Sequence, residues 1–132
     1  MGLRYYSRSG WAFSANSCRA DLLGHMHRLA GASGSKRSVL QPAYPRAVFV
    51  ADAEECRVNA AKIAALSDEQ IATLLEKPTV RECTRATPEE PAELVALARS
   101  WQAFLEVCGG YDTDPEWTLP DEQGWKDWEF KR

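Results

Sequence analysis

Cysteine and histidine are the residues of this 132-residue chain whose chemistry depends most on their spacing. Cys18, His25 and His27 are close in sequence, but a structural zinc site takes four ligands, usually supplied as tight pairs. On a helix, residues two positions apart point about 200° away from each other. His25 and His27 could not then bind one ion, so we expect no metal site and no other cofactor.

Cys18 is also the cysteine best placed to act as a nucleophile, because it lies near an expected helix start and precedes Arg19. Its base would have to be His25 or His27, one to three turns further along the same helix. No familiar catalytic sequence surrounds it. A buried core cysteine is therefore the preferred interpretation. A small enzyme with a cysteine nucleophile stays as a second alternative.

Residues 31–38, Gly-Ala-Ser-Gly-Ser-Lys-Arg-Ser, have the small and basic composition of a phosphate-binding loop. They lack the G-x-x-x-x-G-K-[ST] spacing, and they follow a helix instead of joining a strand to a helix. Their backbone amides would not be aimed at an anion from a helix start. We predict a mobile loop here.

Acidic pairs such as Asp112/Asp114 and Glu89/Glu90 could serve acid–base catalysis. Adjacent acids in turns and at helix starts are more often solvated or capping groups. The chain also contains none of the serine-hydrolase, metalloprotease, dinucleotide-binding or kinase motifs. The sequence therefore favours a protein that is not an enzyme and predicts no catalytic residue.

The positive charge is gathered in residues 1–50, which hold seven basic side chains and one acidic side chain, while the whole chain carries −3. Such asymmetry hints at the kind of partner. We predict that Arg19, Arg28, Lys36 and Arg37 bind an acidic partner or phosphate. In the alternative interpretation the two halves neutralise each other on the surface, where exposed ion pairs contribute little.

Residues 111–132 place large aromatic rings among acids. Tryptophan is enriched in the residues that dominate protein interfaces. We predict an aromatic docking surface made by Trp117, Trp125 and Trp128. The alternative is a segment folded back onto the core, where each ring would bury on the order of 150–250 Å².

Four helices and several strands are expected to position these residues. Aromatic runs at 4–6 and 11–14 around a Ser-Arg-Ser-Gly turn predict a hairpin, and residues 47–51 predict a buried strand. A weaker strand is predicted at 79–84. Capping residues predict helix starts at Asn16 or Ser17, Asp52, Ser67 and Thr87. Pro91 can shift the last of these starts by a few residues, and that helix is expected to end at Gly109–Gly110.

These elements predict an α+β fold, a small sheet covered by three or four helices; the alternative is an α/β two-layer sandwich. We expect one domain, with a globular part at 1–110 and residues 111–132 packed on it. No apolar run approaches the ~20 residues of a membrane span. With no secretory leader and four scattered cysteines, we expect a cytoplasmic protein.

The favoured function is a non-enzymatic protein-binding module. A small phage-type or bacterial-type inhibitor or regulator of a larger nucleic-acid-handling partner would have this profile. The first alternative is direct nucleic-acid binding through the basic N-terminal half, where Lys36 and Arg37 would contact the phosphate backbone. The sequence leaves the oligomeric state open.

Overall fold

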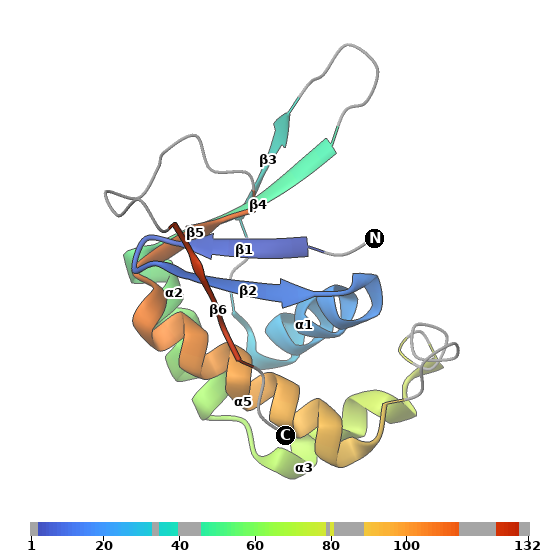
Figure 1. The fold of residues 1–132 in the computed structure, drawn as a ribbon. Helices are drawn as coiled ribbons and strands as arrows, with labels where there is room; N and C mark the ends of the chain where they lie inside the picture. The colour runs from blue at the N-terminus through green and yellow to red at the C-terminus, as the bar shows by residue number, and fades with distance from the viewer. Residues whose placement is uncertain are drawn as a thin grey trace.

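The computed structural model describes residues 3–32, 35–39, 46–78, 80, 89–113 and 124–129, with the backbone alone at 35–39 and 46–48. The described strands form one six-stranded sheet in the order β3-β4-β5-β1-β2-β6. Helices α1, α2 and α5 pack against one face of this sheet (Figure 1). Every strand pair is antiparallel except the pair β2 and β6. The predicted α+β class is confirmed, because the helices lie on one face of a sheet that is mostly antiparallel.

The predicted N-terminal hairpin is confirmed. Strands β1 (Leu3–Ser7) and β2 (Trp11–Ala15) pair antiparallel, with Tyr5 opposite Phe13. In the turn, the backbone N–H of Trp11 donates to Ser7 Oγ over 2.8 Å, and Gly10 has φ 96°, which glycine adopts readily. Tyr5 and Phe13 both face the helices, as the alternation of a strand requires.

The remaining strands come from three separate parts of the chain. β3 (Ser35–Val39) pairs antiparallel with β4 (Arg46–Asp52), which contains the strand predicted at 47–51. β5 (Gly110–Asp112) lies between β4 and β1, and β6 (Lys126–Asp127) runs parallel to β2 at the far edge. The mobile loop predicted at 31–38 is wrong from Ser35 onward, because the ladder with β4 makes those residues a strand.

Helix α1 (Ser17–Ala30) and helix α2 (Ala53–Ala64) start at the predicted caps. Asn16 accepts a hydrogen bond from the backbone of Arg19, and Asp52 forms a full capping box with Glu55. The short helix α3 (Asp68–Ala72) is capped by Ser67 and continues as the 3₁₀ turn η1 (Thr73–Glu76).

The long helix α5 (Pro91–Cys108) starts later than predicted. Glu90 is the N-cap residue and makes no side-chain capping bond, while Pro91 takes the first helical position, where its missing N–H costs nothing. The expected cap Thr87 lies outside the described residues, and so does the strand predicted at 79–84 except for Val80, which is helical. The helix ends at Gly109 in the left-handed conformation, as predicted.

The core is built around Trp101 of α5, which has 1% of its surface exposed. Its ring centroid lies 4.7 Å from that of Tyr5, 5.1 Å from Phe13 and 5.6 Å from Tyr111, all on the sheet. Edge-to-face geometry at these distances is favourable for aromatic pairs. The indole N–H of Trp101 donates to His27 Nε2 over 2.9 Å, so α1 supplies the hydrogen-bond acceptor that the buried ring needs.

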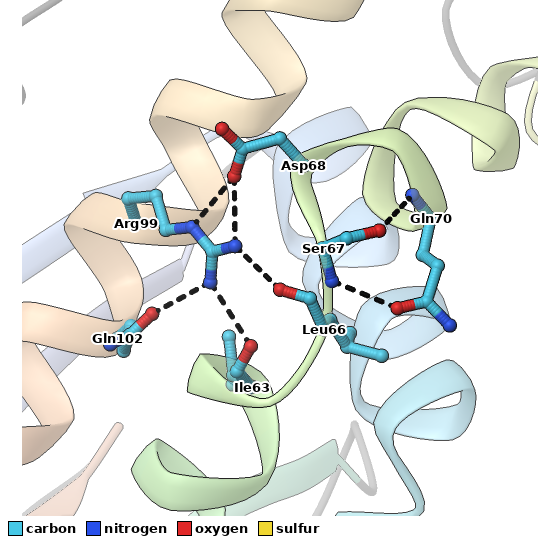
Figure 2. A network of polar contacts seen from close by, with 7 residues as sticks. All are labelled: Ile63, Leu66, Ser67, Asp68, Gln70, Arg99 and Gln102. Carbon is cyan, nitrogen blue, oxygen red and sulfur yellow. Dashed lines mark hydrogen bonds and ion pairs between the residues drawn. The ribbon is translucent and has the colours of Figure 1, made fainter.

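Arg99 ties α5 to the end of α2 (Figure 2). Its guanidinium donates to the backbone carbonyls of Ile63, over 3.1 Å, and Leu66, over 2.6 Å. It also forms an ion pair with Asp68 over 2.8 Å and a hydrogen bond with Gln102 over 2.9 Å. Arg99 is therefore a second donor to the Ile63 carbonyl, which also accepts from the backbone N–H of Leu66 over 3.0 Å, and it binds the Leu66 carbonyl just beyond the end of α2.

Candidate interaction surface

The outer strand β3 lies at one edge of the described sheet. Its one strand neighbour among the described residues is β4, so the other side of its backbone pairs with no described strand. The β3–β4 hairpin extends away from the helices, whereas β1 and β2 lie over them (Figure 1). An unpaired row of backbone N–H and C=O groups can accept another extended chain.

Two of the four predicted basic site residues belong to this outer strand. Lys36 pairs in register with Phe49, and Arg37 pairs with Val48. Arg46 lies opposite Val39 on β4, so the described part of the hairpin carries three basic residues against the single acid Asp52. Sequence reasoning found the cations but not their position on a sheet edge, since it treated them as part of a loop.

The structure separates the other two predicted basic residues from each other. Arg19 and Arg28 are nine positions apart on α1, which places them on opposite sides of the helix. Arg19 Nε forms an ion pair with Glu89 Oε1 over 3.0 Å, and 20% of the Arg19 side chain is exposed. Because its charge is already paired within the molecule, Arg19 would bind an acidic partner less strongly.

Arg28 lies in the last turn of α1 and is exposed. Its Nη2 donates to His25 Nδ1 over 3.3 Å. Partial burial, followed by the positive charge of Arg28, lowers the pKa of His25 below its usual value. His25 is thereby favoured in the neutral form, which can accept this hydrogen bond.

The two described tryptophans of the predicted docking surface contact the protein itself. Trp125 donates from Nε1 to the Ser7 carbonyl over 2.7 Å, and its ring lies 4.9 Å from that of Tyr6. Trp128 donates to Ser100 Oγ over 3.0 Å and packs 5.4 Å from Trp11. Both rings are half-buried. Trp117 lies outside the described residues.

A second feature, which sequence reasoning missed, lies on the sheet face that points away from the helices. Arg4 and Tyr6 alternate with the buried Tyr5 and therefore share that face. The guanidinium of Arg4 lies 5.5 Å from the Tyr6 ring and forms an ion pair with Asp127 of β6. These contacts connect β6 to the β1–β2 hairpin, so this face of the sheet has a structural role.

The arrangement of α1 does not support catalysis by Cys18. Seven and nine residues separate Cys18 from His25 and His27, or about 10 and 14 Å along a helix. Hydrogen-bonded activation of a nucleophile requires direct contact between the base and the thiol. His27 Nε2 instead accepts a hydrogen bond from the indole N–H of Trp101.

A shallow cleft of about 370 Å³ opens where β4, β5 and the start of α2 meet. Its acids Asp52 and Glu55 are engaged in the capping box of α2, and Asp112 is 8% exposed. In the described part of the chain, no group of three or more His, Cys, Asp or Glu residues is arranged to hold a metal ion. None of the described helices is long and apolar enough to cross a membrane.

The fold and surface define a small α+β protein with a basic outer strand. Comparison with known proteins found no matching family model, no matching curated protein and no matching solved structure.

Proposed function

We propose that this protein is a non-enzymatic binding module that captures an acidic, extended segment of a protein partner by adding it to the sheet beside β3. The observation that carries the proposal is the outer edge of β3, a five-residue strand containing Lys36 and Arg37, which pairs with no other strand among the described residues. Main-chain hydrogen bonds would supply affinity, and the cations would select for acidic sequences.

The charge of the hairpin decides between possible occupants of this edge. Lysine on an edge strand discourages pairing with an identical strand, because like charges would meet across the new ladder. A second copy of β3 is therefore disfavoured, while a segment rich in Asp and Glu is attracted. The chain as a whole carries −3, which favours an acidic peptide over a long polyanion such as nucleic acid.

A protein that binds in this way acts by occlusion. A partner segment held as an extra strand is withdrawn from its other contacts, so the module would inhibit or regulate a larger protein without any chemical step. In this proposal Trp125 and Trp128, which contact the β1–β2 hairpin and α5, support the sheet and do not form the docking surface.

The test is a titration of a fluorescent peptide of alternating glutamate and valine, followed by anisotropy at low and physiological salt. We expect saturable binding that weakens as salt rises. The double variant Lys36→Glu/Arg37→Glu should weaken it about 10-fold or more, as expected for two reversed charge contacts. The matched control Arg57→Glu/Lys126→Glu reverses two cations away from β3 and should bind as the unmodified protein does.

Two further measurements separate the alternatives. A peptide with methylated backbone nitrogens should fail to bind, because it cannot complete the ladder with β3. Binding that survives methylation would show that charge alone is responsible and would contradict strand addition. Oligonucleotides could instead bind more tightly than the peptide, with an affinity that falls steeply as salt rises. If the Lys36→Glu/Arg37→Glu variant lost that steep salt dependence, direct nucleic-acid binding would replace the proposal.

A further inference from the structure

The two basic residues of β3 are consecutive, and the ladder with β4 shows which face of the sheet each one belongs to. Lys36 is in register with Phe49, and Arg37 is in register with Val48. Phe49 packs against the hydrophobic core, so its position belongs to the face on which the helices lie. Residues directly opposite each other in a ladder share a face, and successive residues alternate between faces. Lys36 therefore belongs to the helix side of the sheet and Arg37 to the outer side.

We propose that the partner segment presents two consecutive acidic residues to β3, one on each face of the extended sheet. This inference rests on the proposed function, because it requires a strand to be added beside β3. An added strand continues the pleat of the sheet, so two successive residues of that strand lie opposite Lys36 and Arg37. Each acid then forms a cross-strand pair of opposite charge, which stabilises a sheet.

The spacing of the acids distinguishes this site from a general attraction for negative charge. Acids separated by one position lie on the same face of a strand, so only one of them can lie opposite a cation of β3. The second acid would then lie opposite an uncharged residue of β3 or beyond its end; the uncharged residues are Ser35, Ser38 and Val39. Consecutive acids are the arrangement that uses both positive charges of the strand.

The direction of the β3–β4 hairpin allows an acid on either face. The hairpin extends away from the helices, so an acid on the helix side does not have to enter the core (Figure 1). A carboxylate that stays in contact with water avoids the large cost of burying a charge. Each of the two pairs should then contribute the modest energy of an exposed cross-strand ion pair, which corresponds to an affinity difference of a few-fold.

Arg46 adds positive charge without changing this spacing. It is on β4 in register with Val39, and therefore belongs to the same outer face as Arg37. A strand added beside β3 would lie two strand spacings, or about 10 Å, from β4. At that distance Arg46 attracts an acidic segment through a field that salt screens, and it does not form a direct pair. Arg46→Gln should thus weaken the binding of differently spaced acidic peptides to the same extent.

The test compares two end-capped peptides of identical composition and net charge by fluorescence anisotropy at low salt. One is Val-Thr-Glu-Glu-Thr-Val and the other is Val-Glu-Thr-Thr-Glu-Val. We expect the peptide with consecutive glutamates to bind about 3-fold more tightly, as one additional cross-strand ion pair predicts. Lys36→Gln and Arg37→Gln should each abolish this preference, because a single cation can meet only one glutamate of either peptide. The matched control Arg46→Gln should retain it.

The comparison of the two peptides on the unmodified protein decides the question even if a variant does not fold. Equal affinities would overturn this inference and leave strand addition beside β3 standing. A preference that persists in both Lys36→Gln and Arg37→Gln would also overturn it, since the preference would then arise from the peptides themselves. Binding of neither peptide would overturn the inference together with the proposed function.

Discussion

Gly110 shows how a single residue allows α5 to pass into the sheet. Its φ of 112° lies in the region that favours glycine, and a β-carbon added there would lie 3.2 Å from the Ala51 carbonyl oxygen. Gly24 presents the opposite case, because it is inside α1 and has nothing within 4 Å of an added β-carbon. Replacing each glycine with alanine therefore measures a different effect on stability: backbone strain at Gly110 and helix propensity at Gly24.

Gly110→Ala should lower the free energy of unfolding by about 2–3 kcal/mol, because the backbone is strained and the strand β4 must move. Gly24→Ala should raise it by up to about 1 kcal/mol, since alanine loses less conformational entropy in a helix. Urea unfolding of both variants measures the difference. A Gly110→Ala protein as stable as the unmodified chain would show that β5 does not need this conformation.

Secondary-structure elements differ in how far the sequence predicts them, and the reason is the range of the interactions that form each one. The start of α2 was predictable because the capping box of Asp52 and Glu55 is local. β5 and β6 were missed because strands of three and two residues depend on pairing with β1, β4 and β2, which are distant in sequence.

The same distinction explains what was missed in the candidate site. Lys36 and Arg37 were selected from composition, but Ser-Lys-Arg-Ser has little strand propensity of its own, so the ladder with β4 was not foreseen.

The junction of α2 and α5 allows a prediction at this scale. Arg99→Met should lower the free energy of unfolding by about 2 kcal/mol, because the carbonyls of Ile63 and Leu66 lose a charged donor. Thermal unfolding followed by circular dichroism measures the loss. Arg57→Met removes a fully exposed cation that pairs with Glu54 and should leave Tm unchanged. Equal losses in both variants would contradict the role assigned to Arg99.

At the scale of the whole molecule, the aromatic core links stability to alkaline pH. Burial raises the pKa of Tyr5 to about 12, and burial also raises the pKa of Tyr111. Each phenol keeps its proton in the folded state at a pH where it would lose it in the unfolded state, where its pKa is about 10. Stability from this source is complete below pH 10 and is lost as the pH rises toward 12.

The free energy of unfolding should therefore fall between pH 10 and 12, by about 1.4 kcal/mol per pH unit for each buried tyrosine. Urea titrations at pH 9, 10 and 11 measure the slope. The variant Tyr5→Phe should show a shallower slope than the unmodified protein, whatever its stability at neutral pH. An unchanged slope would mean that Tyr5 ionises as easily in the folded state as in the unfolded one.

The position of β5 has a consequence for biosynthesis. β1–β2 and β3–β4 are local hairpins, but residues 110–112 are the strand that joins them into one sheet. During translation the first fifty residues leave the ribosome as two hairpins that are not yet paired with each other. Each hairpin then has a strand edge whose backbone hydrogen-bonding groups lack a partner strand. They unite when the end of α5 emerges, so a nascent chain that stalls before that point carries exposed strands prone to self-association.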